Sequence, residues 1–170
     1  MARTYSVSDS VVIDADPSAI YAKVSNPALM GRWSPENLGA TVPDGAQEAY
    51  VGMVFDGHNK RGPMGWTTRC TVTVADPGER FAFRVRGIGR RKPVLPGRIA
   101  TWEYRFEPVE GGTRVTEIWT DDRRAWPDAL ANAFDRLATR GQVFADFQRA
   151  NIRTTLSNLK KAMETTPTTS

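Results

Sequence analysis

The C-terminal part of the chain carries a helical pattern of apolar residues. Between positions 127 and 163 they recur at steps of three and four, which is the spacing of one face of an α-helix. The stripe consists of Leu130, Phe134, Leu137, Gly141, Phe144, Gln148, Ile152, Leu156, Leu159 and Met163. Pro127 suits the first turn, where no amide donor is needed. We expect one long helix here, with Gly141 as the point at which it could break or bend.

Before this helix, apolar and polar residues alternate in seven stretches, which is the pattern of strands with one buried face. The stretches cover residues 5–13, 37–42, 51–59, 65–75, 80–86, 99–108 and 113–120. Short segments rich in Gly, Pro and Asp join most of them and predict hairpin turns. Residues 87–97 predict a longer loop rich in Gly and Pro. Consecutive hairpins predict an antiparallel sheet.

Two short helices are predicted between the first and second strands. Asp16 is placed to cap the first helix, and Pro17 to occupy its first position. Asn26-Pro27 begins the second helix. Ser34-Pro35 ends it, because the residue before a proline disfavours the helical conformation.

This order of elements predicts an α+β fold, in which a curved antiparallel seven-stranded sheet wraps around a long C-terminal helix. One face of such a sheet is apolar and must be covered. The final helix is the only predicted element large enough to cover it. A twisted sheet curls, so a straight helix contacts it best at its edges. We therefore expect a hollow between the sheet and the helix.

Composition restricts the class of protein. The 170 residues are 40% hydrophobic and 25% charged, which suits one globular domain. We place this domain at residues 1–164, with a flexible Thr-rich tail at 165–170. The single cysteine, Cys70, favours a reducing compartment. The N-terminus lacks the apolar segment of a signal peptide, and no run approaches the ~18 apolar residues of a membrane span. These features predict a cytoplasmic protein.

Motifs spread over nearly the whole chain match one known superfamily. They are Ile13-Asp14-Ala15-Asp16-Pro17, Trp33-Ser34-Pro35, Gly57-His58-Asn59-Lys60-Arg61-Gly62, Trp66-Thr67-Thr68-Arg69-Cys70, residues 76–83, Gly112-Thr113-Arg114-Val115-Thr116 and Thr155-Leu156 with Leu159-Lys160. Together they resemble the SRPBCC superfamily of START lipid-transfer domains and polyketide cyclases/dehydrases, and most of all its actinobacterial members. The resemblance implies the helix-grip fold, a hydrophobic cavity and no bound cofactor.

Aromatic residues are predicted to gather at one end of the fold. That end should hold both short helices, the hairpin at Arg61, the loop at Arg90 and the start of the long helix. All five tryptophans lie at or near it: Trp33, Trp66, Trp102, Trp119 and Trp126. Indole rings suit the mouth of a pocket for a flat apolar molecule, although they could equally be ordinary core residues. The residues that we predict to bind a ligand are Trp33, Phe55, Asn59, Trp66, Arg69, Phe83, Trp102, Tyr104, Glu117, Trp119 and Phe144.

Glu117 is the one candidate catalytic residue. It shares strand parity with Val115 and Trp119, so it points inward if they do. A buried carboxylate needs a partner, and its candidate partners are Arg69, Asn59 and Tyr104. Burial would also raise its pKa, so that it could orient a ligand or act as an acid or base. The alternative is a cross-strand ion pair with Arg105 or Arg114 on the solvent-exposed face.

The sequence predicts no metal site. His58 is the only histidine, and strand parity places it on the face opposite Phe55 and Asn59, towards solvent. Metal sites usually need several His, Cys or carboxylate ligands at readable spacing. Cys70 alternates with Val72 and Val74 and is therefore more typical of a small core residue than of a nucleophile.

A basic stretch spans residues 80–98. It contains Arg80, Arg84, Arg86, Arg90, Arg91, Lys92 and Arg98, with no acidic residue between Phe81 and Trp102. Such a patch could attract an anionic ligand, an acidic lipid surface or nucleic acid. It has little of the aromatic interleaving typical of single-strand binders, so it is no strong nucleic-acid signal. The alternative is a solvated hairpin and loop.

Three functions fit these patterns. The first is a monomeric or homodimeric binding protein for a lipid, polyketide or aromatic metabolite. The second is a polyketide cyclase or aromatase, in which the cavity holds the chain in a reactive geometry. The third is a protein-interaction module with a filled pocket and an exposed apolar patch. The lack of an evident acid/base pair favours binding.

Overall fold

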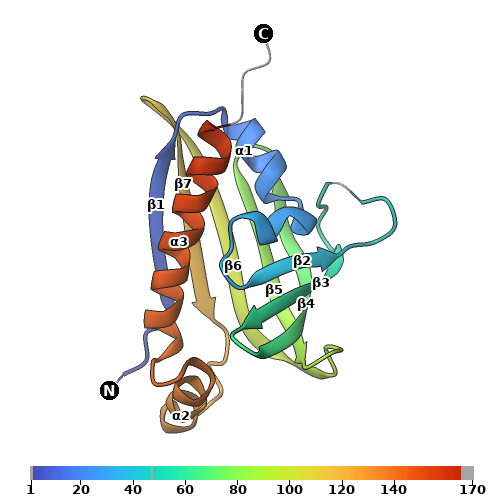
Figure 1. Cartoon of the computed structure of the whole chain (residues 1–170), viewed down its shortest axis with the longest axis vertical. Coiled ribbons are helices and arrows are strands. Elements are labelled where there is room, and N and C mark those ends of the chain that lie inside the picture. The colour runs from blue at the N-terminus through green and yellow to red at the C-terminus, as the bar shows by residue number, and fades with distance from the viewer. Residues whose placement is uncertain (1, 47, 166–170) are drawn as a thin grey trace.

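A seven-stranded antiparallel sheet forms one wall of the protein in the computed structural model, which describes residues 2–46 and 48–165 (Figure 1). The strand order is β1-β7-β6-β5-β4-β3-β2. The strands are β1 Ser6–Ile13, β2 Asn37–Thr41, β3 Val54–Arg61, β4 Met64–Asp76, β5 Arg80–Gly89, β6 Leu95–Val109 and β7 Gly112–Asp121. The helices are α1 Pro17–Val24, the 3-10 helix η1 Pro27–Arg32, α2 Asp128–Thr139 and α3 Phe144–Glu164. The predicted α+β helix-grip architecture is therefore confirmed.

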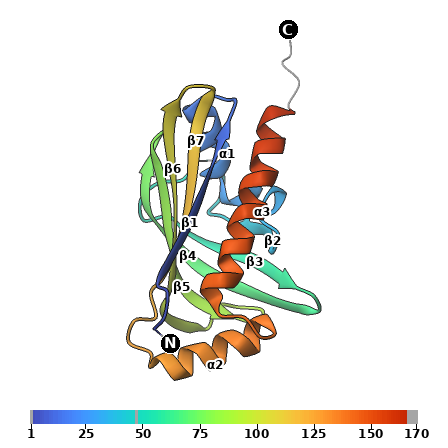
Figure 2. The same ribbon diagram turned by 90° about the vertical axis from the view of Figure 1, so that its left-hand side faces the viewer.

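The sheet is curved, and α3 lies across its concave face (Figure 2). Register shifts interrupt the ladders of β2 with β3, β4 with β5, and β5 with β6. Such bulges bend strands and increase their twist. The β5 and β6 strands also extend further than predicted, to Gly89 and from Leu95, so the loop between them is shorter than residues 87–97.

Both short helices begin where predicted, and each has a side-chain cap, of which only the one at Asp16 was predicted. The Asp16 side chain accepts hydrogen bonds from the amides of Ser18 and Ala19, and the Asn26 side chain accepts one from the amide of Ala28. The prediction that α1 lies at the same end of the fold as the Arg61 hairpin is wrong. Helix α1 lies at the opposite end, where the β4–β5 turn at Gly78 packs against Ser18. Strand β1 ends there, so α1, which follows directly, must begin there.

The predicted single C-terminal helix is two helices. Arg140 ends α2 in the left-handed conformation, with φ of 60°, and Gly141 follows with φ of 117°. A left-handed residue followed by glycine is a common helix terminator. Figure 2 shows α2 crossing the end of the sheet at a steep angle to α3. The prediction that Gly141 could break the helix is confirmed, and the continuous rod is wrong.

The break between α2 and α3 also makes the predicted buried stripe wrong for α2. Leu130, Phe134 and Leu137 are exposed by 58%, 44% and 83%. The face that α2 buries carries Ala131, Asp135 and Thr139 instead. Because the chain turns after α2, this helix does not share the burial direction of α3, and one stripe cannot describe both.

A buried ionic network attaches α2 to the sheet. The guanidinium of Arg123 contacts Asp121 at 2.9 Å and Asp135 of α2 at 2.8 Å. Arg3 pairs with the same Asp121 carboxylate. The second oxygen of Asp135 accepts a hydrogen bond from the Phe144 amide at 3.1 Å, which caps α3. These contacts join the N-terminal segment, β7, α2 and α3 at one point.

The packed core fills the end of the fold near α1. The ring of Tyr21 contacts Phe81 and Phe106 edge-on at centroid distances of 6.5 and 5.7 Å. On the other side, α3 packs mainly against β1 and β7, with Ile152, Leu156 and Leu159 buried. The rest of the concave face, over β3 to β6, is not covered by α3. That uncovered part contains the candidate site.

Candidate functional site

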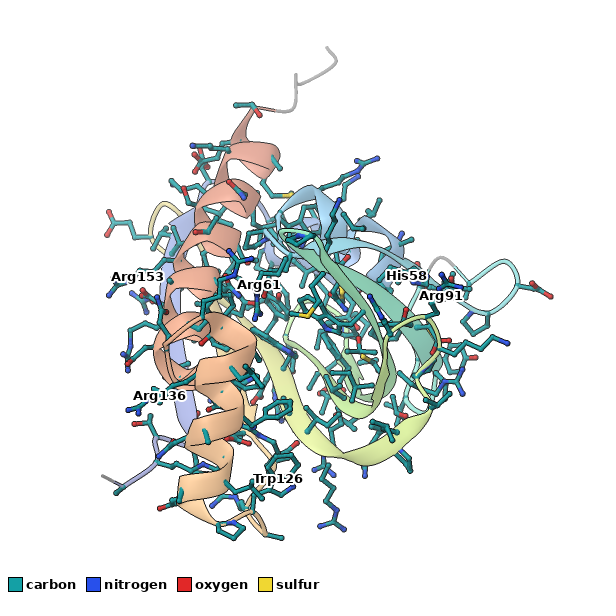
Figure 3. All side chains as sticks on the ribbon, turned by 60° about the horizontal axis from the view of Figure 1, so that its bottom comes forward. His58, Arg61, Arg91, Trp126, Arg136 and Arg153 are labelled. Atoms are coloured by element: carbon teal, nitrogen blue, oxygen red, sulfur yellow. The ribbon has the colours of Figure 1, made fainter. Side chains whose placement is uncertain are left out.

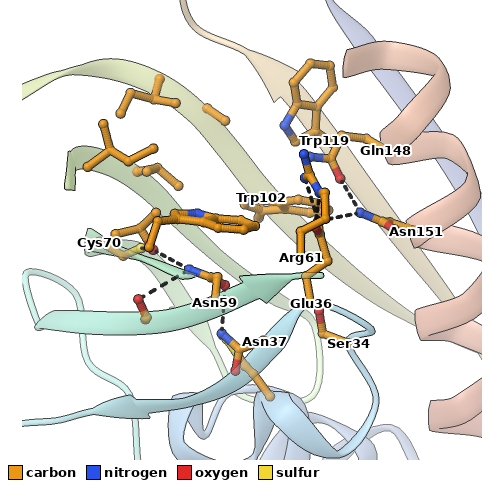
Figure 4. A pocket seen from close by; sticks show the side chains of 18 of the residues that line it. Ser34, Glu36, Asn37, Asn59, Arg61, Cys70, Trp102, Trp119, Gln148 and Asn151 are labelled. Carbon is orange, nitrogen blue, oxygen red and sulfur yellow. Dashed lines mark hydrogen bonds and ion pairs between the residues drawn. The ribbon is translucent and has the colours of Figure 1, made fainter. Parts of the chain in front are cut away.

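A pocket of about 780 Å³ lies between the concave face of the sheet, α2, α3 and the segment from η1 to β2 (Figure 4). All but one of the predicted ligand-binding residues line it. These are Trp33, Phe55, Asn59, Trp66, Phe83, Trp102, Tyr104, Glu117, Trp119 and Phe144. Strand parity explains the agreement, because Phe83, Trp102 and Trp119 are directly opposite one another on β5, β6 and β7. Residues that are opposite across a sheet share one face.

Arg69 is the predicted residue that does not line the pocket. It is directly opposite Asp56, and its guanidinium makes two hydrogen bonds of 2.9 Å with that carboxylate on the outer face. Its neighbours Thr68 and Cys70 face the pocket instead. Because side chains alternate along a strand, Arg69 cannot share their direction. Arg69 was therefore placed on the wrong face of β4, and its neighbours Thr68 and Cys70 occupy the face that lines the pocket.

Four of the five tryptophans line the pocket, and Trp126 does not. Its ring packs edge-on against Phe134 at 5.7 Å and lies 5.4 Å from the guanidinium of Arg123. Figure 3 shows Trp126 beside α2. Trp126 therefore lies outside the predicted cluster.

Glu117 points into the pocket, as strand parity predicted, and is 2% exposed. The hydroxyl of Tyr104, one of its three predicted partners, donates a hydrogen bond of 2.7 Å to Oε1. The two residues are directly opposite on β6 and β7. The alternative with Arg105 or Arg114 is wrong, because those side chains pair with Glu103 and Glu107.

The carboxyl of Glu117 is unusual in two respects. Among the residues that the structure describes, no group hydrogen bonds to its Oε2. Burial raises the pKa of Glu117 to about 8, and the hydrogen bond from Tyr104 opposes this rise. Burial and the adjacent carboxyl also raise the pKa of the Tyr104 hydroxyl well above its ordinary value. Both shifts favour the neutral form of the two groups at pH 7.

Arg61 closes part of the pocket mouth, and sequence reasoning gave it no such role. Its Nη2 and Asn151 Nδ2 donate to the same Glu36 oxygen at 3.1 and 3.0 Å. Its Nη1 donates to the carbonyl of Ala138 at 2.7 Å, and its guanidinium lies 4.0 Å from the Phe147 ring. Figure 4 shows Arg61 between the β2–β3 edge and α3. No local pattern signals this contact, because its partners are far apart in sequence.

A chain of polar side chains crosses the β2–β4 wall of the pocket. Asn37 Nδ2 donates to Asn59 Oδ1 at 3.3 Å, and Asn59 Nδ2 donates to Thr68 Oγ1 at 3.4 Å. Cys70 lies beside them, and burial raises the pKa of its thiol to about 12. A thiol with that pKa is not a thiolate nucleophile at neutral pH. Asn37 and Thr68 were not predicted, although Thr68 has the same parity as Cys70.

The remaining candidates lie outside the pocket. His58 is on the outer face, where its Nε2 is 2.8 Å from Thr41 Oγ1, and Figure 3 shows it far from α3. Within residues 2–46 and 48–165, no cluster of three or more His, Cys, Asp or Glu residues could hold a metal ion. No helix in that part of the chain has the length and apolar character needed to cross a membrane.

The basic stretch is divided between pairing and solvent. Arg80 pairs with Glu103 at 2.7 Å. Arg84, Arg86, Arg91, Lys92 and Arg98 are exposed. Arg90, in the β5–β6 loop, lines the pocket mouth. The stretch is therefore mainly a solvated hairpin and loop whose tip lies beside the pocket.

A family model described as "Polyketide cyclase / dehydrase and lipid transport" matches residues 4–164 of this chain. No curated protein matches the chain in sequence. The polyketide-cyclase-like protein Cgl2372 from Corynebacterium glutamicum is a similar solved structure, with 26% identity and a TM-score of 0.57. The alignment covers 97% of this chain and 92% of Cgl2372.

Two further solved structures share the fold. Protein Ms6760 from Mycobacterium smegmatis is 18% identical, with a TM-score of 0.66 and coverage of 96% of this chain and 93% of that one. The di-domain ARO/CYC protein BexL from the BE-7585A biosynthetic pathway is 20% identical, with a TM-score of 0.66. That alignment covers 96% of this chain and 51% of BexL.

Proposed function

This chain belongs to the polyketide cyclase / dehydrase and lipid transport family, and from that membership and the pocket geometry we propose that it binds a hydrophobic small molecule between the sheet and α3. A pocket of about 780 Å³ is in the range of small-molecule sites. The observation that carries the proposal is the aromatic lining, to which Trp33, Trp66, Trp102 and Trp119 contribute indole rings. Such rings offer large apolar contact to a flat or elongated ligand.

Binding can be tested with the protein's own tryptophans. A lipophilic aromatic ligand in the pocket should quench the emission of Trp102 and Trp119 and saturate at one equivalent. Phenylalanine at either position should reduce the quenching. Trp126→Phe is the matched control, because Trp126 lies outside the pocket. Mass spectrometry of molecules that co-purify with the native protein would identify the ligand. Failure of sterols, fatty acids and aromatic polyketides to bind would refute the proposal.

A second function, polyketide cyclase or aromatase activity, is supported by one specific observation. The Tyr104–Glu117 pair places two neutral proton donors in the pocket wall. Such groups can move protons while the pocket holds a flexible chain in a reactive geometry. An enzyme of this kind would convert a poly-ketone chain, and Glu117→Gln would lower turnover more than affinity. If the protein binds such a chain without converting it, the enzymatic role is refuted and the binding role remains.

The protein-interaction alternative required a filled pocket, and the pocket volume counts against it. Its second requirement, an exposed apolar patch, has a counterpart on α2, where Leu130 and Leu137 are exposed. Phe134 is partly exposed but lines the pocket. Small-molecule binding accounts for both the pocket volume and its aromatic lining, and it is therefore the function that we propose first.

A further inference from the structure

The pocket contains one buried polar atom without a partner. Glu117 is 2% exposed, and its Oε2 has no hydrogen-bond partner among the described residues. Buried polar groups in folded proteins are nearly always paired, and leaving one unpaired costs stability. Glu117 is also one of the residues that line the pocket. Oε2 is therefore the part of the wall that a ligand could satisfy.

Among the described residues, no lysine, arginine or histidine hydrogen bonds to the Glu117 carboxyl. The charged and titratable groups on the neighbouring elements show why. Strand β1 places Asp9 directly opposite Glu117, but Asp9 is acidic and pairs with Arg153 of α3 at 3.3 Å. Strand β6 supplies Tyr104, whose hydroxyl is neutral. At the mouth, Arg61 is paired with Glu36. The surroundings of Glu117 therefore favour its uncharged form.

Three other charged residues line the pocket: Arg61 and Glu36, which pair with each other at the mouth, and Arg90 at the rim. The remaining pocket-lining side chains are uncharged. From α3 they are Gln148, Asn151 and Thr155, and from β4 and β5 they are Thr68, Cys70, Phe83 and Val85. Burial accordingly raises the pKa of Glu117 to about 8. Because Oε1 already accepts a hydrogen bond from Tyr104, the carboxylic proton belongs on Oε2. The pocket wall therefore presents an O–H donor.

We infer that Glu117 Oε2 selects ligands that carry a carbonyl oxygen on an apolar framework, such as aromatic ketones or quinones. A carbonyl oxygen has lone pairs that accept this hydrogen bond and no proton that would compete for it. The surrounding rings of Trp102, Trp119 and Phe83 provide apolar contact for the remainder of the ligand. This inference rests on the proposed function, since it names the chemical group that the binding site recognises.

The test compares two probes that differ only in the carbonyl group. 9-Fluorenone and fluorene are both planar tricyclic molecules, and only fluorenone has an acceptor oxygen. In equilibrium dialysis at pH 6.5 we expect fluorenone to bind at least about tenfold more tightly, because a site built to donate a hydrogen bond is left unpaired by fluorene. Glu117→Leu should abolish this preference. Glu103→Gln is the matched control, since Glu103 pairs with Arg80 and Arg105 on the outer face.

Two further measurements separate a ligand contact from a structural role. The preference of the wild-type protein should disappear as pH rises above about 8, where a carboxylate would repel the carbonyl oxygen. Glu117→Gln retains an N–H donor and should keep the preference at all pH values, which also covers the case in which Glu117→Leu fails to fold. The carbonyl stretch of bound fluorenone should shift to lower frequency in the wild-type protein.

The outcomes are distinguishable. If the wild-type protein binds fluorene and fluorenone equally well, the donor role of Glu117 is refuted and the proposed function stands. The same conclusion follows if the carbonyl stretch does not shift. If neither probe binds, nor any other lipophilic ligand, both the inference and the proposed function are refuted.

Discussion

The guanidinium of Arg61 lies 4.0 Å from the ring centroid of Phe147, so that the tip of β3 contacts α3 across the mouth of the pocket. The same side chain donates to Glu36 and to the carbonyl of Ala138. One arginine thereby connects β3, the segment before β2, α2 and α3. Its contacts join the walls of the pocket at the point where a ligand would enter.

Replacing Arg61 with alanine should loosen this mouth. The change removes the ion pair with Glu36, the bond to Ala138 and the ring contact, and leaves Glu36 half-buried with only Asn151 as a partner. We expect the free energy of unfolding to fall by about 1–3 kcal/mol and a bound lipophilic probe to dissociate faster. Chemical denaturation and stopped-flow dissociation measure the two effects.

Two variants serve as controls for Arg61. Lysine keeps the charge but loses the planar fork, so Arg61→Lys should recover only part of the stability. Arg86 on β5 is exposed, and Arg86→Ala should leave both measurements unchanged. Equal dissociation rates for Arg61→Ala and the wild-type protein would mean that Arg61 does not control access to the pocket.

The buried contact of Arg123 with Asp121 and Asp135 should be essential for docking α2. Arg123→Ala would leave the Asp135 carboxylate buried without its cation and Asp121 with Arg3 as its remaining cation, and breaking a buried pair in this way typically costs about 3–5 kcal/mol. We expect a loss of that size and faster amide hydrogen exchange throughout α2. Arg136→Ala is the control, because Arg136 lies on the exposed face of the same helix. Unchanged exchange in α2 would contradict a docking role.

Arg140 and Gly141 should respond to substitution in opposite directions. Arg140 adopts φ of 60°, a left-handed conformation that costs most residues energy and glycine very little. Arg140→Gly should therefore stabilise the protein by up to about 1 kcal/mol. Gly141 has φ of 117°, so Gly141→Ala should destabilise it by at least a similar amount. Thermal unfolding of both variants measures the effect, and a stabilising alanine at position 141 would show that the helix break is not needed.

Local periodicity accounts for most of what the sequence predicts correctly. Alternation along β7 placed Glu117 and Trp119 on the concave face, and Tyr104 is among the partners proposed for Glu117. The same rule also exposes the error at Arg69, since its neighbour Cys70 had already been assigned to the core. Where a side chain's direction depends only on its own strand, the sequence is sufficient.

The features that were missed depend on how elements meet in space. Helical spacing cannot tell which neighbour a helix packs against, so the stripe through Leu130 and Leu137 indicated a buried face that α2 turns to solvent. Asp135 is buried because it pairs with Arg123 of a different segment. The Arg61–Glu36 contact likewise depends on the distance between the end of β3 and the segment before β2, which no local pattern contains.

Glu117 should make the stability of the protein depend on pH in an unusual direction. Its pKa is about 8 in the folded state and 4.5 as an ordinary side chain. Between those values the folded protein binds the proton more tightly than the unfolded chain. The free energy of unfolding must therefore fall as pH rises from about 4.5 to about 8, and level off above that range. Since one pKa unit corresponds to about 1.4 kcal/mol, we expect a loss of more than that.

The contribution of Glu117 can be isolated by subtraction, because other groups titrate in the same range. Urea denaturation of the wild-type protein and of Glu117→Gln at a series of pH values gives a difference curve in which shared titrations cancel. Glutamine has the same shape and cannot ionise, so the variant should gain stability relative to the wild-type protein as pH rises towards 8. A flat difference curve would mean that the carboxyl is ionised in the folded protein at neutral pH. In that case Oε2 could not donate a hydrogen bond, and the pocket would favour ligands that carry a donor or a positive charge.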